Sequence, residues 1–445
     1  MHTSLNDEHV PAVNKGTHFY ACICDLNGQF RGKRLAIDLL EKATMDGIRM
    51  PLSAAGVDIW GTDVVESGLT FEKGDLDGVC RPIGRGPINI LGSDPSSLLL
   101  PMWMQKDTGE AFFSDARQVL AHVLRGYEDR GLTPVVSTEL EFHLVEPGEA
   151  RLVPIQLDRS APSGKFDNIY SIQELDKTSA FFDEIHALAQ QSDIAIDSII
   201  SEGGPRQFEV TLKHQTDALK AADDTLLIKQ IVRAVARRHG AQACFMAKPY
   251  ADAPGNGMHV HASLLNAKGQ NIFDDGTPQG SPELGFAIAG LIASMQEFCL
   301  IFAPHANSYR RFSPDSLAPT KASWGYEDRT CAIRVPGGPN VAKRFEHRVS
   351  GSDTNPYLVL AAILAGALHG LANRNAPRSH SKDVPGTDLS TNWDESLKVF
   401  KASQLAKDLL HPGLVHYFSA CKQQELNRFR TELSEFEIET YRSTV

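Results

Sequence analysis

Apolar and polar residues follow different periods in two parts of the chain. Residues 17 to 105 contain short apolar runs separated by turn signals, and Asp25-Leu-Asn-Gly28 predicts a β-hairpin between two of these runs. Beyond this part, Ser114 is the expected N-cap of a helix that runs to Arg130 and stops at Gly131. The pattern predicts a small, mostly β unit followed by a unit of alternating helices and strands.

In the second unit, the apolar residues of each segment recur with the period either of a strand or of a helix. Strands are expected over 134–145, 243–248 and 257–265, and helices over 176–191, 215–239, 282–303 and 356–372. Residues 374–393 are rich in Pro, Ser, Asp and Asn, which predicts an exposed connection before C-terminal helices. No internal repeat or low-complexity segment interrupts this order.

Length and composition are those of a soluble protein with two domains. A chain of 445 residues is too long for one ordinary core. Hydrophobic residues make up 42% and charged residues 22%, which is typical of globular proteins. We expect a flexible N-terminus over 1–16, a small domain over 17–107 and a larger domain over 108–445.

Charge, hydropathy and cysteines argue against several classes of protein. The formal net charge of −11 disfavours a nucleic acid or an anionic membrane as the main partner, because both attract clustered Lys and Arg. The most apolar helical stretch, 358–368, is shorter than the roughly 20 residues that span a bilayer, so a buried helix is expected. The first ten residues lack the apolar core of a secretory signal. The seven cysteines are scattered, which favours reduced thiols and a cytoplasmic location.

Four strand-like segments each turn a selected set of Glu, His and Arg side chains to one face. In chain order these sets are Glu139, Glu141 and His143; Gln207, Glu209 and Thr211, with Glu202 across a Gly-Gly-Pro turn; His259, His261 and Ser263; and Arg344, Glu346 and Arg348. The solvated face of an edge strand would explain any one segment. The repetition favours a curved sheet with a polar inner surface.

Carboxylates and one imidazole are the candidate metal ligands. They are Glu139, Glu141, Glu202, Glu209, Glu346 and His259. Like charges at short range raise each other's pKa, so such a cluster needs bound cations. Oxygen ligands with a single imidazole suit Mg²⁺ or Mn²⁺, and the lack of thiolates argues against structural zinc or copper.

Arginines form the second half of the candidate site. They are Arg311, Arg329, Arg334, Arg344 and Arg348. Guanidinium groups bind carboxylates and phosphates and stay charged at any working pH. Each arginine alone could form a surface ion pair. Together with the carboxylates they indicate a site that binds metal, phosphate and a substrate carboxylate, although the chain has neither a Walker motif nor a convincing dinucleotide fingerprint.

Eight motifs in order between residues 139 and 357 resemble the glutamine synthetase superfamily, and the resemblance covers the chain from about residue 17 to 372. They are Glu-x-Glu-Phe at 139–142, Glu-x-x-Pro-x-Gln-x-Glu at 202–209, Lys-Pro at 248, Gly-Met-His-x-His-x-Ser at 257–263, Asn-Ser-Tyr-x-Arg at 307–311, Arg-x-x-x-x-Arg-x-Pro at 329–336, Arg-x-Glu-x-Arg at 344–348 and Asn-Pro-Tyr at 355–357. The resemblance implies an α+β fold with a small β-grasp-like N-terminal domain. A catalytic domain with a curved, funnel-shaped antiparallel sheet surrounded by helices would follow it. The resemblance also implies a homo-oligomeric ring, a dodecamer of two stacked hexamers, with sites shared between subunits.

The same resemblance implies roles for individual residues. Two or more Mg²⁺ or Mn²⁺ ions are implied, one held by Glu141, Glu202 and Glu209 and another by Glu139, His259 and Glu346. The implied contacts to glutamate and the transferred phosphate are Arg311, Arg348 and the backbone of Gly255. The implied ATP contacts are His261, Ser263, Arg329, Arg334 and Arg344, and the implied catalytic residues are Glu202, Arg311 and Arg329.

The implied reaction has two steps. The γ-carboxylate of glutamate attacks the γ-phosphorus of ATP, and an amine then displaces phosphate from the acyl phosphate. Metal ions and arginines would neutralise charge on the transferring group. The site would also have to exclude water, which hydrolyses the intermediate.

The sequence departs from true glutamine synthetases where ammonium would bind. The segment 54–63 lacks their Phe-Asp-Gly-Ser-Ser, which leaves Asp58 or Asp63 as substitutes, and Leu317 stands where they carry a Glu. Leu in place of a carboxylate removes a partner for ammonium and adds apolar surface. Tyr170 occupies the place of a family tyrosine near the amine.

The departures resemble γ-glutamylpolyamine and γ-glutamylamide synthetases, which load glutamate onto amines such as putrescine for catabolism. Trp60 and Trp324 could line a wider amine pocket, although simple packing is more common for such residues. A true glutamine synthetase and a non-catalytic ring-forming relative remain the alternatives. All six implied metal positions are filled, which disfavours the non-catalytic one.

Overall fold

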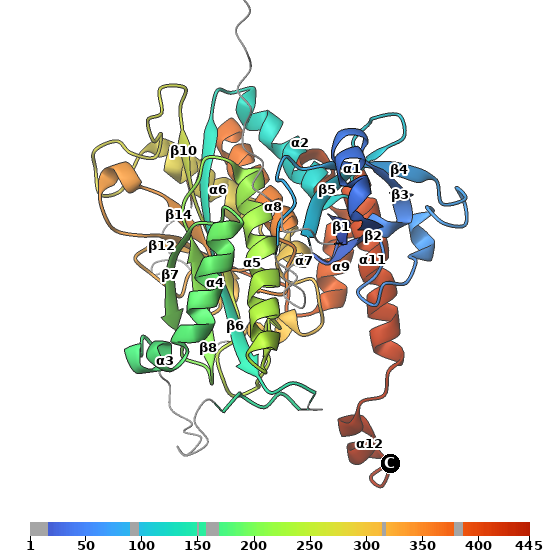
Figure 1. The fold of residues 1–445 in the computed structure, drawn as a ribbon. Helices are drawn as coiled ribbons and strands as arrows, with labels where there is room; N and C mark the ends of the chain where they lie inside the picture. Colours follow the sequence, from blue (N-terminus) through green and yellow to red (C-terminus); the bar gives the residue numbers. More distant parts are fainter. Residues whose placement is uncertain (1–16, 90–97, 149–150, 157–168, 314–316, 378–385) are drawn as a thin grey trace, which may run out of the picture.

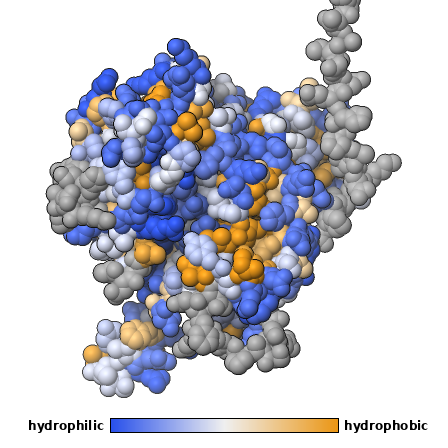
Figure 2. All heavy atoms as spheres, turned by 90° about the vertical axis from the view of Figure 1, so that its left-hand side faces the viewer, coloured by the Kyte–Doolittle hydropathy of each residue, from blue (hydrophilic) through white to orange (hydrophobic). Residues whose placement is uncertain are grey.

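The computed structural model describes residues 17–89, 98–148, 151–156, 169–313, 317–377 and 386–445. The predicted flexible N-terminus over 1–16 lies outside these residues. Figure 1 shows a smaller β domain on the right and a larger sheet on the left, with α5 (Ala218–Arg238) and α8 (Pro356–Asn373) between them. Hydrophilic side chains cover much of the face in Figure 2, and apolar surface gathers near its centre.

The smaller sheet has the strand order β2-β1-β5-β4-β3. Its elements are β1 (His18–Cys24), β2 (Phe30–Ala36), α1 (Leu40–Asp46), β3 (Ile48–Pro51), β4 (Asp77–Pro82) and β5 (Leu98–Lys106). β1 and β5 are parallel, and the other neighbours are antiparallel. Alternate residues of the central strands, among them Phe19, Ile23 and Leu100, are buried in a common apolar core.

The predicted hairpin joins β1 to β2. Gly28 has a φ of +71°, a left-handed conformation that glycine adopts without strain. The buried carboxylate of Asp25 accepts hydrogen bonds from the backbone N–H groups of Asn27 and Gln29, both at 2.9 Å. The Asn-Gly pair thus marks the turn, and Asp25 fixes its shape.

Helix α2 (Ala116–Glu128) begins one residue later than predicted. Asp115, not Ser114, is its N-cap and accepts two backbone N–H bonds from the first turn. The other oxygen of Asp115 accepts the backbone N–H of Met104 in β5 at 2.6 Å. The carboxylate of Asp115 thus binds the helix with one oxygen and the neighbouring strand with the other.

The larger sheet has the order β12-β13-β14-β10-β6-β8-β7, with β9 paired to β6 outside this path. Its strands are β6 (Thr133–Val145), β7 (Ile196–Ser201), β8 (Gln207–Leu212), β9 (Gln242–Cys244), β10 (Met258–Leu265), β12 (Trp324–Tyr326), β13 (Ile333–Val335) and β14 (Phe345–His347). Neighbours are antiparallel as predicted, except that β12 and β13 are parallel. Residues 327–332 lead the chain back so that Ile333 pairs with Trp324. Strand β13 therefore runs in the same direction as β12.

Helices make up much of the rest of the described structure. Besides α2, α5 and α8, they are α3 (Ile172–Lys177), α4 (Ser179–Gln191), α6 (Pro282–Ser294), α7 (Cys299–Phe302), α9 (Trp393–Ala402), α10 (Gln404–Leu409), α11 (Pro412–Thr431) and α12 (Glu435–Tyr441). The single helix predicted over 282–303 is interrupted after Ser294. The hydroxyl of Ser294 donates to the Gly290 carbonyl at 2.9 Å, a type of bond that often bends a helix.

Helix α8 contains residues 358–368, the apolar stretch that was predicted to form a buried helix. By length and composition it could cross a membrane, but 72% of it is buried inside the protein, as expected for a core helix. It packs closely on α6, because a Cβ on Gly290 would lie only 2.2 Å from the Gly366 carbonyl oxygen. The prediction of a buried helix is confirmed.

The segment predicted as an exposed connection is more ordered than expected in its described part. Thr387–Asp388 forms strand β15, which pairs with β11 (Lys321–Ala322). Leu389 and Ser390 are buried. Polar composition therefore does not mean full exposure here, because Leu389 belongs to the apolar core and Ser390 accepts the side-chain amide of Gln296 at 2.8 Å.

Helix α11 returns to the N-terminal domain, beside β1 and β2 in Figure 1. Lys422 and Glu425 are both fully buried and form an ion pair at 2.9 Å. Glu425 also accepts the Asn27 side-chain amide at 2.9 Å and the backbone N–H of Ile59 at 2.8 Å. The last long helix thus closes the turn of the first hairpin.

Candidate active site

Neighbouring strands of the larger sheet bring the predicted acidic and histidine side chains together. The residues that face one another across the strands are Glu141 and Glu209, Glu139 and His259, and Glu346 and His261. The residues between them, such as Leu140 and Phe142, are buried in the apolar core. Because side chains alternate along a strand, the acidic set shares one face of β6, β8, β10 and β14.

Glu141, Glu202 and Glu209 form an acidic group in which one oxygen of each lies within 4.8 Å of the others. Burial and, next, the charge of Glu202 raise the pKa of Glu141 to about 7. Burial and the charges of the neighbouring glutamates raise the pKa of Glu209 to about 9. Both directions are those of carboxylates that repel one another in a partly desolvated site.

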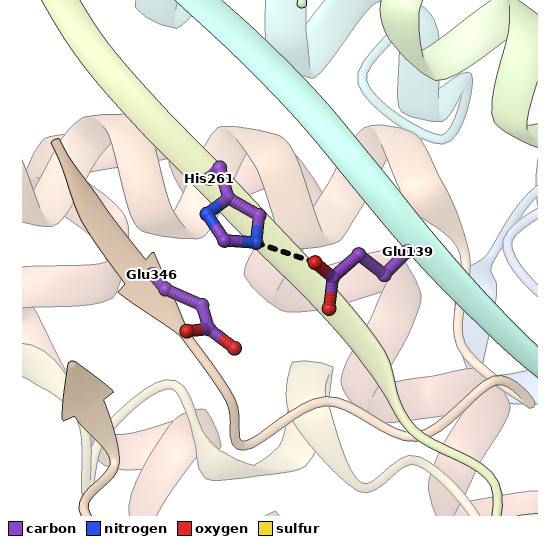
Figure 3. A group of neighbouring side chains, drawn as sticks. All are labelled: Glu139, His261 and Glu346. Carbon is purple, nitrogen blue, oxygen red and sulfur yellow. Dashed lines mark hydrogen bonds and ion pairs between the residues drawn. The ribbon is translucent and has the colours of Figure 1, made fainter. Parts of the chain in front are cut away.

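The carboxylate of Glu139 lies beside two histidines (Figure 3). His261 Nε2 is 2.8 Å from its Oε1, and His259 Nδ1 is 3.0 Å from its Oε2. Glu139 and His261 form a candidate metal group with Glu346, and Glu139 and His259 form one with Glu209. Burial raises the pKa of Glu139, but the bonds with the two histidines outweigh it and hold the pKa well below its usual range.

The donor set fits a hard divalent cation. The groups offer mostly carboxylate oxygens with an imidazole, which suits Mg²⁺ or Mn²⁺. The raised pKa values of Glu141 and Glu209 mean that protons compensate the buried charge where no cation does. The implied set of Glu141, Glu202 and Glu209 lies together, and Glu139 contacts both His259 and His261.

Four of the five predicted arginines contact Glu346, His261 or the backbone that follows β14. Arg334 donates to one oxygen of Glu346 at 2.9 Å, and Arg348 pairs with the other. Arg344 Nε lies 3.1 Å from His261 Nδ1. The fourth, Arg311, is buried and donates to the carbonyl of Val349 at 2.8 Å. Ser263 lies half-buried on the same strand as His261.

The fifth arginine, Arg329, is exposed. It forms a side-chain hydrogen bond with Tyr170, and this bond raises the pKa of Arg329. Tyr170 is 55% exposed and has a φ of +58°, held by its N–H bond to the Ser201 carbonyl at 2.7 Å. Such backbone strain in a non-glycine residue is common at functional sites. Leu317 is 62% exposed and follows residues 314–316, which lie outside the described part of the chain.

Sequence reasoning missed the residues that hold Glu141 in place. Its Oε2 accepts the Gly257 N–H at 2.7 Å and the Gln207 side-chain amide at 3.3 Å. The same amide donates to the Gly255 carbonyl at 3.0 Å. Asn256 is fully buried and donates to the Met246 carbonyl at 2.8 Å. Strand alternation placed Gln207 on the polar face, but partners so far apart in sequence leave no local signal.

The two aspartates considered in the segment 54–63 have different environments. Asp58 is buried, and one of its oxygens accepts the backbone N–H groups of Trp60 and Thr62. The other oxygen accepts the side-chain amide of Gln424 at 2.9 Å. Asp58 is therefore occupied in shaping its loop, whereas Asp63 is exposed.

The two tryptophans considered for the amine pocket have different surroundings. Trp60 is 45% exposed, and the guanidinium of Arg428 lies 4.2 Å from its ring centroid. Trp324 is buried in β12 and packs edge-on against Tyr326. Packing thus accounts for Trp324.

Comparison with known proteins decides the family. Residues 113–441 match the model of the glutamine synthetase catalytic domain. The chain belongs to the glutamine synthetase family. It is 37% identical over 425 residues to gamma-glutamylputrescine synthetase of Escherichia coli (strain K12), covering 94% of this chain and 90% of that protein. It is 30% identical to glutamate–isopropylamine ligase of Pseudomonas sp, covering 94% and 93% respectively.

The glutamine synthetase fold of this family member is matched along almost its whole length. A solved structure described as a GmaS/ADP complex superposes with a TM-score of 0.82 at 26% identity, covering 96% of each chain. The predicted family, fold class and ligase activity are confirmed. Glutamine synthetase family enzymes use ATP and divalent metal ions, in agreement with the acidic groups found here.

Proposed function

We propose that this protein is a γ-glutamyl–amine ligase. It joins the γ-carboxylate of glutamate to an alkylamine or polyamine, with ATP as co-substrate and γ-glutamyl phosphate as intermediate. The observation that carries this proposal is the acidic group of Glu141, Glu202 and Glu209 beside buried arginines. It occurs in a chain similar over nearly its full length to proteins named as gamma-glutamylputrescine synthetase and glutamate–isopropylamine ligase.

Two metal positions are proposed on the polar face. Glu141, Glu202 and Glu209 are the ligands of one ion. Glu139, His259 and Glu346 are the ligands of the other, because His259 Nδ1 lies 3.0 Å from Glu139 and 3.7 Å from Glu346. Bound Mg²⁺ or Mn²⁺ supplies positive charge that neutralises phosphate oxygens.

The chain's own cations complete the site. Arg311 and Arg348 bind the carboxylate of glutamate and the transferred phosphate, beside the backbone of Gly255. Contacts to ATP are assigned to His261, Ser263, Arg329, Arg334 and Arg344. Arg329 is proposed to neutralise charge on the transferring phosphoryl group. Glu202, Arg311 and Arg329 are the proposed catalytic residues.

The amine is expected to carry carbon as well as nitrogen. Leu317 offers exposed apolar surface in place of a carboxylate, and the side chain of Tyr170 is hydrogen-bonded to Arg329. Apolar contact stabilises a bound alkyl chain by about 25 cal/mol per Å² of apolar surface buried. Ammonium has no apolar surface and gains no such stabilisation. An alkylamine or polyamine is therefore the better nucleophile.

An amine panel tests the proposal. The purified protein is incubated with glutamate, ATP, Mg²⁺ and one amine at a time, among them putrescine, isopropylamine, ethanolamine and ammonium, and phosphate release and product mass are measured. We expect at least one organic amine to be turned over with a higher kcat/KM than ammonium. Preference for ammonium over every amine would overturn the proposal.

A glutamine synthetase that uses ammonia is the second candidate. It is favoured by a specific observation, since the chain is also 30% identical over 427 residues to glutamine synthetase of Pyrococcus horikoshii. The same panel decides between the two. A homo-oligomeric ring of two stacked hexamers with shared sites, a cytoplasmic location and the domain division at residues 107 and 108 are part of the proposal, and electron microscopy of the purified protein tests the ring.

A further inference from the structure

A lysine is buried beneath the backbone that supports the acidic group. Lys229 lies on α5 and is 4% exposed. Its ammonium donates to the carbonyls of Ser352 at 2.6 Å and Thr354 at 3.5 Å. Its neighbour Ile228 is fully buried and apolar. Burial lowers the pKa of Lys229 to about 7, so burying this amine costs free energy that an apolar side chain would not. The two bonds that it donates are therefore the reason we consider it for a specific role.

The carbonyls that Lys229 binds belong to the 350–355 loop, which supports the start of β10. The hydroxyl of Ser352 donates to the Gly257 carbonyl at 2.6 Å. The backbone N–H of Ser352 donates to the Asn256 carbonyl at 3.0 Å, and the Ser350 carbonyl accepts the N–H of Met258 at 2.9 Å. The loop therefore fixes three consecutive residues at the floor of the site.

Gly257 in turn holds Glu141 with both of its backbone groups. Its N–H donates to Glu141 Oε2 at 2.7 Å, and its carbonyl accepts the backbone N–H of Glu141 at 3.0 Å. A Cβ at position 257 would lie 2.8 Å from Arg311 Nη2 and 2.9 Å from His259 Nε2. The peptide of Gly257 is thus confined between the carboxylate and two site side chains, and its carbonyl is bonded to the 350–355 loop.

The same loop reaches Arg311 by a second path. Asp353 Oδ2 accepts the hydroxyl of Ser308 at 2.6 Å, and Ser308 begins the 3₁₀ turn η4 (Ser308–Arg311). Burial raises the pKa of Asp353, and the bond from Ser308 and then the charge of Lys229 oppose that rise. Lys229 therefore favours the ionised form of the carboxylate that anchors this turn.

We propose that Lys229 is a positioning residue of the active site. Through Ser352 and Gly257 it sets the position of the Glu141 carboxylate, and through Asp353 and Ser308 it sets the turn that carries Arg311. The inference rests on the proposed function, because that function assigns Glu141 to a metal ion and Arg311 to glutamate. Groups that orient metal ligands from outside contribute about 10-fold to 100-fold to metal affinity or activity.

Lys229→Met tests the inference, because methionine keeps the length of the side chain and removes the donor. Mn²⁺ affinity of the full-length, substrate-free protein is measured by the loss of the free Mn²⁺ electron paramagnetic resonance signal. We expect affinity to fall about tenfold and the KM for glutamate to rise, with the protein still folded by circular dichroism. The KM readout reports on Arg311 and the Mn²⁺ readout on Glu141.

Lys422→Met is the matched control. Lys422 is also a fully buried helical lysine, but its ammonium donates to Asn27 and Glu425 at the domain junction, whereas that of Lys229 donates to carbonyls of the 350–355 loop. We expect this variant to lower the melting temperature and to leave Mn²⁺ affinity unchanged. An equal loss of Mn²⁺ affinity in both variants would mean that Lys229 acts through general stability, which overturns the inference.

Ser352→Ala keeps the test decisive should Lys229→Met fail to fold. This variant removes only the hydroxyl that holds the Gly257 carbonyl, and we expect it to weaken Mn²⁺ binding as well. Wild-type Mn²⁺ affinity in Ser352→Ala would overturn the path through Gly257. If the wild-type protein neither binds Mn²⁺ nor turns over any amine, the proposed function fails and the inference with it. Active wild type with unaffected variants rejects the inference alone.

Discussion

Glu141 and Glu209 lie directly opposite each other on β6 and β8, and their carboxylates belong to the same acidic group. Like charges at opposed positions of neighbouring antiparallel strands destabilise a sheet. Their pKa values of about 7 and about 9 mean that the pair retains protons when no cation is bound. The spacing of the two strands therefore creates a repulsion that either protons or a divalent cation removes.

The metal-free protein is expected to lose stability as pH rises. The folded-state pKa values of Glu141 and Glu209, about 7 and about 9, lie above the ordinary value of 4.5, so the folded state holds protons that the unfolded state releases. This contribution is fully present below about pH 4.5 and is lost as pH rises through the two folded-state values. Thermal unfolding in EDTA from about pH 6 to about pH 9 measures it.

The pH effect of this pair is isolated by comparison with Glu209→Gln, in which one titrating group is absent. The difference in melting temperature between the variant and the wild-type protein is expected to grow in the variant's favour as pH rises in EDTA. A constant difference across the range would contradict the assignment of the raised pKa to Glu209.

Metal ions are expected to stabilise the fold through the acidic group. At a Mn²⁺ concentration of about 100 times the Kd, binding to the folded state alone adds about 2.7 kcal/mol to the free energy of unfolding. Glu209→Gln should lose most of this gain, because it removes a ligand. Melting temperatures with Mn²⁺ and with EDTA test this, and Glu432→Gln, a change at an exposed glutamate at the end of α11, should keep the full gain.

Glu202→Ala is expected to abolish most turnover. Glu202 lies in the group with Glu141 and Glu209, so its loss removes a ligand of the proposed metal ion, and we expect kcat to fall by about 10²-fold to 10³-fold because the ion's charge stabilisation is weakened. Phosphate release with the best amine of the panel measures the effect. A kcat within the error of wild type would exclude Glu202 from the catalytic residues.

Leu317→Glu is expected to shift selectivity toward ammonium. The added carboxylate provides a partner for a small, strongly hydrated cation and removes apolar contact with an alkyl chain. The ratio of kcat/KM for the best organic amine to that for ammonium should fall. Leu317→Met keeps an apolar side chain and should leave the ratio unchanged; an unchanged ratio in Leu317→Glu would remove Leu317 from the specificity argument.

Asp58→Ala is expected to destabilise the protein by about 1–3 kcal/mol, because it leaves two backbone N–H groups and the side-chain amide of Gln424 without their acceptor, the buried Asp58 carboxylate. Asp63 is exposed, so Asp63→Ala should change the free energy of unfolding little. Urea unfolding of both variants measures the difference. Equal effects of the two changes would contradict the structural role given to Asp58.

The sequence was sufficient to predict the polar face of the site, because the period of two along a strand fixes which residues share a side. Glu139 and Glu141 on β6 and Glu209 on β8 lie together for this reason. The short-range chemistry of the hairpin turn at Asp25–Gly28 was equally readable. These features depend on residues within one segment.

Features that depend on distant partners could not be predicted. Asp115 replaces Ser114 as N-cap because β5 supplies a second donor for its carboxylate. Asp58 is occupied by Gln424 of α11, more than three hundred positions away. Lys229 reads as an ordinary polar residue in a helical pattern, and only the packing of the 350–355 loop against α5 reveals that it is buried. Tertiary contact, not local preference, decides each of these.

The contact between Asn27 and Glu425 joins residues that are 398 positions apart. At a synthesis rate of about 5 to 20 residues per second, Glu425 leaves the ribosome about 20 to 80 s after Asn27. The first hairpin therefore spends most of the synthesis of the chain with the side chain of Asn27 unburied. The N-terminal domain completes its packing only when α11 emerges, so translation order makes the first strands of this ligase among the last to be fully enclosed.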